Sequence, residues 1–158
     1  MHMSAYAEAD SRAVITVQFT VRPGQGRPSG FDLGDIHVTG DLGTAQSAGH
    51  SPDQGMMIYL SVVQLLDGLG TFLRSSAKSY AFTGVDTSFG LVFRRAKDGL
   101  SVATKDGLIA RTTTPELAAA IASAAEALSR ALPPEDAASS DYQDALSAFR
   151  PLASEDRA

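Results

Sequence analysis

The segment from Met56 to Arg74 constrains the fold more than any other part of this chain, because its apolar residues recur at the three- and four-residue intervals of an α-helix. They cover most of the helix circumference and comprise Ile58, Val62, Leu65, Leu66, Leu69, Phe72 and Leu73. The remaining narrow polar stripe consists of Ser61, Gln64, Asp67, Gly68, Thr71 and Ser75. This pattern predicts a helix buried in a core, with one edge in solvent.

The helix is not expected to cross a membrane, because Gln64, Asp67, Gly68 and Gly70 interrupt the apolar run that a span requires. The N-terminal residues contain no apolar signal-peptide region. The chain has no cysteine, which excludes disulfides, thiolate zinc sites and thiol catalysis. These features predict a cytoplasmic protein without a membrane partner.

With 158 residues, 44% of them hydrophobic, the chain is long enough for one well-formed core and too short for two ordinary domains. We expect a single domain over residues 13–150. Residues 1–12 are short of core-forming side chains and residues 151–158 form a charged tail, and we expect both segments to be disordered.

Strand-like alternation precedes and follows the central helix. Apolar and polar residues alternate in residues 13–22 and 35–40, which predicts two strands of an N-terminal hairpin joined by a loop that includes residues 23–30. Residues 42–55 are predicted to form a second loop, in which Ser51 or Asp53 caps the central helix. After the helix, four apolar runs of period two predict a four-stranded antiparallel meander. Their core positions are Tyr80 and Phe82, then Phe89, Leu91 and Phe93, then Leu100 and Val102, then Leu108 with Ala110 or Ile109.

Turn and cap residues support these assignments. Lys97-Asp98-Gly99 suits a turn, and Asp106-Gly107 is a two-residue type I′ hairpin signal. A helix is predicted from Thr113 or Thr114 to about Leu132, and a shorter one from Asp141 to about Arg150. The expected fold class is α+β: an antiparallel sheet made of the N-terminal hairpin and the meander, with the central helix and the C-terminal helices packed on one face.

Charge is distributed unevenly along the chain. The net charge is −5, and the residues from Pro115 onward carry all of it, with eight acids against three arginines. Between Lys78 and Thr112 there are six basic residues against three acids. The face of the meander turned away from the helices should present Val92, Arg94, Ser101, Ala103, Lys105 and Arg111, a mixed apolar and basic surface. Such a surface suits a protein partner, whereas the overall acidity argues against nucleic acid.

Recognisable catalytic patterns are lacking. There is no Gly-x-Ser-x-Gly elbow, and the acids Asp86, Asp98 and Asp106 lie in predicted turns, where carboxylates hydrogen-bond the backbone. The glycines inside the central helix favour close packing contacts over a nucleotide loop. No cofactor is therefore expected.

One alternative involves metal. Asp35 and His37 lie two apart on a predicted strand and so point to the same face, and His50 follows in the long loop. Two imidazoles and a carboxylate form a known ligand set for metal ions. A small enzyme or metal-binding protein with a site at Asp35, His37 and His50 is the alternative hypothesis.

The leading hypothesis is a non-enzymatic cytoplasmic protein-interaction module, comparable in kind to small inhibitor, immunity or accessory proteins. Its interaction surface would include Arg94, Lys105 and Arg111, and its partner would be an acidic polypeptide or, through the sheet face or an edge strand, a second copy in a homodimer. The sequence leaves open whether the acidic C-terminal part folds onto the basic sheet.

Overall fold

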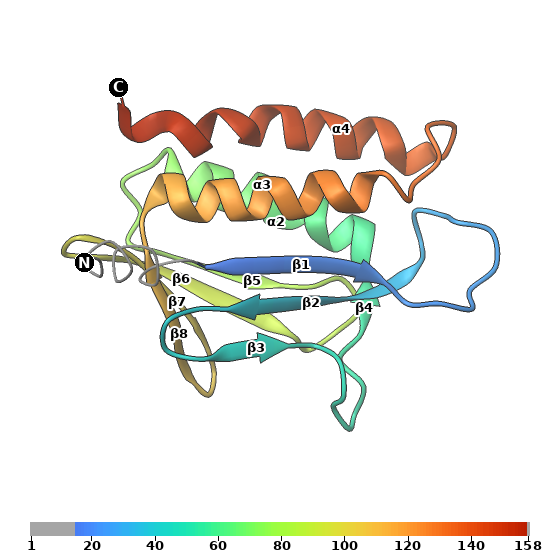
Figure 1. The fold of residues 1–158 in the computed structure, drawn as a ribbon, viewed down its shortest axis with the longest axis horizontal. Coiled ribbons are helices and arrows are strands. Elements are labelled where there is room, and N and C mark those ends of the chain that lie inside the picture. The colour runs from blue at the N-terminus through green and yellow to red at the C-terminus, as the bar shows by residue number, and fades with distance from the viewer. Residues whose placement is uncertain (1–14, 158) are drawn as a thin grey trace, which may run out of the picture.

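A computed structural model describes residues 15–157 of the chain, so the prediction for residues 1–12 lies outside the described part. Two antiparallel sheets stand below a layer of helices, with α2 and α3 next to the sheets and α4 above them (Figure 1). The strands are β1 (Thr16–Val21), β2 (Leu33–Thr39), β3 (Thr44–Gln46), β4 (Met56–Met57), β5 (Ser79–Thr83), β6 (Gly90–Ala96), β7 (Gly99–Thr104) and β8 (Gly107–Thr112). The helices are α2 (Ile58–Leu73), α3 (Thr114–Ser129), α4 (Ala137–Phe149) and the 3-10 helix Arg150–Arg157. The α+β class is confirmed.

The first sheet is built on the predicted N-terminal hairpin. β1 pairs with β2 from Thr16 opposite Thr39 to Val21 opposite Gly34, and β2 also pairs with β3 and β4. The prediction of an unstructured loop at residues 42–55 is wrong in part, because β3 lies inside it. Ala45 of β3 is buried opposite Val38, which explains why this short segment joins the sheet.

The second sheet is the predicted meander, in the order β5-β6-β7-β8. Phe82, Leu91, Phe93, Leu100 and Val102 point into the common core, as the alternation indicated. The β7–β8 turn differs from the predicted type I′ turn, because Asp106 does not adopt positive φ and Gly107 begins β8 opposite Thr104. A type I′ turn requires positive φ at both of its central residues.

Helix α2 is the buried helix that its pattern predicted, with two corrections. Ser61 was placed on the polar stripe but is fully buried, because its Oγ accepts a hydrogen bond from the backbone N–H of Val85 at 2.8 Å. Neither Ser51 nor Asp53 caps the helix; Met57 holds the N-cap position without a side-chain hydrogen bond. Gly68 provides the predicted close contact, since a Cβ there would lie 2.1 Å from the Tyr80 hydroxyl oxygen.

The C-terminal helices differ from the prediction at their ends: α3 stops at Ser129, before the predicted end near Leu132, whereas α4 and the segment after it contain more helix than predicted. Thr113 caps α3 by accepting from the Glu116 N–H. Helix α4 begins at Ala137, four residues before the predicted start, because Asp136 caps it and also binds the Gly30 N–H. Where a disordered tail was expected from residue 151, the 3-10 helix continues the chain and places Leu152 in the core at 1% exposure.

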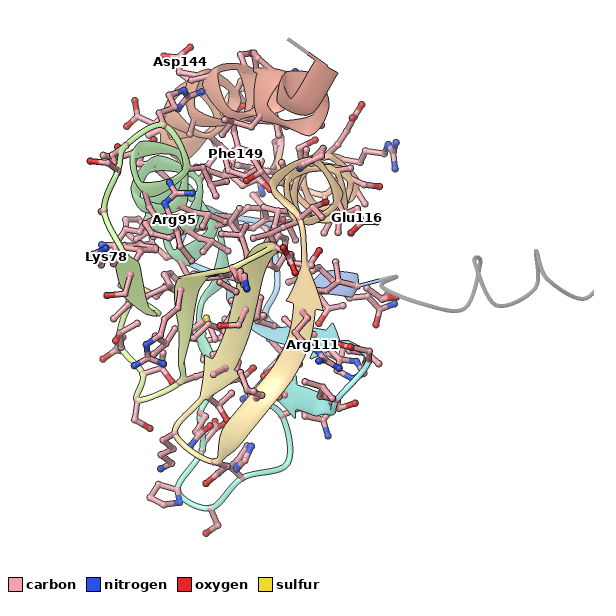
Figure 2. The ribbon with its side chains drawn as sticks, turned by 90° about the vertical axis from the view of Figure 1, so that its left-hand side faces the viewer. Lys78, Arg95, Arg111, Glu116, Asp144 and Phe149 are labelled. Carbon is pink, nitrogen blue, oxygen red and sulfur yellow. The ribbon has the colours of Figure 1, made fainter. Side chains whose placement is uncertain are left out.

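Arg95 of β6 is hydrogen-bonded to other parts of the fold. Arg95 extends toward the end of α2 (Figure 2), where its guanidinium donates to the carbonyl oxygens of Phe72, Ser75 and Ala77 at 2.6 to 2.9 Å. It also lies over the Phe72 ring, 4.8 Å from the centroid. The Phe72 carbonyl lies in the last turn of α2, and the Ser75 and Ala77 carbonyls lie in the segment after the helix. The Arg95 guanidinium therefore holds the end of α2 to the residues that follow it and is already engaged there.

Candidate functional site

The face of the β5–β8 sheet that is turned away from the helices is the surface singled out by the sequence, and we call it the outer face. Strand register arranges it in rows. One row is apolar and consists of Ala81, Val92, Ala103 and Leu108, and the next row consists of Ser79, Arg94, Ser101 and Arg111. An apolar strip therefore runs beside a basic one across the four strands.

The predicted interaction residues Arg94, Lys105 and Arg111 differ in whether an acidic side chain lies near their charge. Arg94 is exposed, and its guanidinium takes part in no ion pair with the side chains of residues 15–154. Lys105 is exposed in the β7–β8 turn. Arg111 is 68% exposed but lies 3.5 Å from Asp41, at the side of the sheet next to the β2–β3 turn (Figure 2). Arg94 and Lys105 thus form no ion pair with any side chain that the structure describes, whereas Arg111 lies near an acid.

A register irregularity brings an additional apolar side chain to this face. The sequence placed Leu108 on the core side, but a bulge between Val102 and Ala103 sets Leu108 opposite Ala103 and leaves it 51% exposed. Ile109 and Ala110 are both buried instead. In the sequence, the three consecutive apolar residues Leu108-Ile109-Ala110 break the period of two, and this is the signal that could have revealed the bulge.

A wide, open concavity of about 1090 Å³ adjoins the outer face. On the side of the β5–β8 sheet it is lined by Ala81, Val92, Arg94, Lys105 and Leu108, among others. On the opposite side it is lined by β3 and by residues 50–52 of the following loop. Two of the three predicted interaction residues, Arg94 and Lys105, therefore border one concavity, while Arg111 lies outside its lining.

Arg22 binds the loop between β3 and β4, which borders this concavity, to the β1–β2 hairpin. The Arg22 guanidinium donates to both carboxylate oxygens of Asp35 at 2.8 and 2.9 Å and to both of Asp53 at 2.8 Å. The Ser47 hydroxyl donates to Asp35 at 2.7 Å. Arg22 lowers the pKa of Asp35 and of Asp53, and the two carboxylates raise the pKa of Arg22. The network joins the loop to the end of the β1–β2 hairpin.

Replacing Asp35 with asparagine is expected to lower the free energy of unfolding by about 2 kcal/mol near neutral pH, because a charge-assisted hydrogen-bonded pair is lost. The pKa of Asp35 is lower in the folded than in the unfolded protein, so its contribution is fully present above the unfolded value of about 3.9 and is lost as the pH falls toward the folded one. The difference between wild type and D35N in urea unfolding should therefore shrink in acid. A difference that stays constant down to about pH 2 would contradict this account.

The three residues proposed as metal ligands each contact a different group of the protein. Asp35 is held by Arg22 and Ser47, His37 lies on β2 with its ring nitrogen 3.5 Å from the Thr39 hydroxyl, and His50 contacts the Gln46 carbonyl oxygen at 2.7 Å. Among the described side chains, those of residues 15–154, no three His, Cys, Asp or Glu gather as a metal ion would require. The structure does not bring Asp35, His37 and His50 together as a ligand set.

None of the helices in the described part of the chain is long and apolar enough to cross a membrane. The chain matches no protein-family model, no curated protein and no solved structure.

Proposed function

We propose that this protein is a cytoplasmic, non-enzymatic interaction module whose outer face binds an acidic segment of a protein partner. The observation that carries this proposal is the apolar row of the outer face, exposed at its two ends Ala81 and Leu108, beside the charge of Arg94 in the adjacent row. Apolar area supplies affinity, and a complementary charge supplies orientation and specificity.

Charge decides which partner is favoured. The chain as a whole carries −5, so a second copy would meet net repulsion, whereas the region from Lys78 to Thr112 is basic and would attract an acidic segment locally. The absence of cysteine fits a protein that functions without disulfides in a reducing compartment.

The test starts from a displayed library of random peptides of about twelve residues, selected on the wild-type protein. Selected peptides should be rich in Asp, Glu and apolar residues, and Arg94→Glu should weaken their binding about tenfold or more, because attraction becomes repulsion. Lys97→Glu is the matched control: it makes the same charge change in the β6–β7 turn and should leave affinity nearly unchanged.

Two results would overturn the proposal. One is a selection that yields no acidic peptides; the other is binding that Arg94→Glu and Lys97→Glu weaken equally, which would indicate unspecific attraction by net charge.

A further inference from the structure

The β5 strand forms an open edge of the second sheet. It is the first strand in the order β5-β6-β7-β8, and within residues 15–157 it pairs only with β6. In Figure 2 Lys78, which precedes β5, lies at the outer border of the sheet. The side chains of Ser79, Ala81 and Thr83 are exposed, and Ala81 and Thr83 line the concavity.

Hydrogen bonding shows which backbone groups of β5 face outward. The Arg95 N–H donates to the Lys78 carbonyl oxygen at 2.9 Å, and the Gly84 N–H donates to that of Phe89 at 3.0 Å. Antiparallel strands exchange bonds at every second residue, so the even-numbered residues between these two positions bond to β6. The N–H and C=O groups of Ser79, Ala81 and Thr83 therefore point away from the sheet.

In the described part of the chain, the β8 edge is covered, β3 is short, and β1 lies next to a helix. At β8, the Leu42 N–H donates to the Ile109 carbonyl oxygen and the Arg111 N–H donates to the Asp41 carboxylate, both at 2.9 Å, so the β2–β3 turn covers that edge. β3 has three residues, and His50 contacts its Gln46 carbonyl oxygen. β1 lies directly beneath α3 (Figure 1). Natural proteins protect edges in such ways, and an unprotected edge invites an added strand.

We propose that the acidic partner segment, whose binding rests on the function proposed above, adds to β5 as a fifth, antiparallel strand. Its main chain would pair with the outward N–H and C=O groups of Ser79, Ala81 and Thr83. In this mode of recognition the backbone bonds supply affinity and alternate side chains supply specificity.

The rows of the outer face predict the sequence of that segment. The residue opposite Ala81 extends the apolar row, so it should be apolar, and the residue opposite Ser79 extends the row that contains Arg94. Strands lie about 4.8 Å apart, so the long Arg94 side chain can reach across the small Ser79 toward an acid two strands away. Because the added strand is antiparallel, the acid comes two residues after the apolar residue.

The test uses the strongest peptide from the library selection and a series of variants of it, each N-methylated at one backbone amide. Strand addition predicts that binding falls about tenfold at every second position and little at the positions between, because only alternate N–H groups face β5. Selected peptides should share an apolar residue followed two positions later by Asp or Glu.

A substitution in the protein, in place of a change in the peptide, tests the β5 edge independently. Ala81→Pro removes an N–H that bonds to nothing in β6 and should abolish peptide binding, whereas Ala81→Val keeps the N–H and should bind normally. If the Ala81→Pro variant does not fold, the series of N-methylated peptides alone tests strand addition.

The outcomes separate the two proposals. If Arg94→Glu weakens peptide binding but N-methylation does not weaken it at every second position, the proposed interaction module is supported and strand addition is overturned. Absence of any acidic binder overturns both. A wild-type dimer in native mass spectrometry that Ala81→Pro dissociates would make a second copy the occupant of the edge and would overturn the acidic partner.

Discussion

Gly34→Ala is expected to destabilise the protein by about 3 kcal/mol or more, because the added methyl group has no space in the fold. A Cβ at Gly34 would lie 2.1 Å from the carbonyl oxygen of Thr20 and 2.8 Å from the Ile58 side chain. The first contact is with backbone inside the β1–β2 ladder, so it cannot be relieved by rotating a side chain. The hairpin and the start of α2 would have to move apart.

Gly43→Ala is the matched control, because it adds the same methyl group in the β2–β3 turn, where the nearest atom would be 3.5 Å away. Chemical denaturation should show Gly43→Ala close to wild type. Equal losses for the two variants would mean that glycine flexibility, and not packing, sets the stability of this hairpin.

Leu65→Ala is expected to cost about 3 to 4 kcal/mol, because Leu65 is fully buried in α2 and its removal leaves a cavity that a packed core closes only in part. Leu60→Ala, in the same helix but at a half-buried position, should cost about 1 kcal/mol. Urea unfolding of both variants measures the difference. Similar losses at the two positions would show that α2 is not the centre of the core.

Much of the fold follows from residue periodicity, because a helix or strand with one buried side repeats its apolar residues at a fixed interval. That signal predicted α2 and the meander. It predicted nothing at β3, since three residues with one buried alanine are too short to show a period. It also missed the start of α4, where the cap, Asp136, is set by its contact with Gly30, more than a hundred residues earlier in the chain.

The candidate site could be predicted only in part. The alternation placed Arg94 and Arg111 on the outer face correctly, because side chains alternate between the two faces of a strand. The β5 edge was not identified, because an edge depends on which strands lie beside it. The engagement of Asp35 by Arg22 likewise depends on a contact across the hairpin, and no spacing in the sequence encodes it.

The most direct measurement of the central claim is an NMR titration of the uniformly ¹⁵N-labelled protein with the strongest selected acidic peptide. The account predicts that the largest changes in amide chemical shift fall on Ser79, Ala81, Thr83 and Arg94, and that the amide protons of the first three become protected from exchange. Changes centred elsewhere, such as at the exposed Phe31 and Leu33, would contradict it.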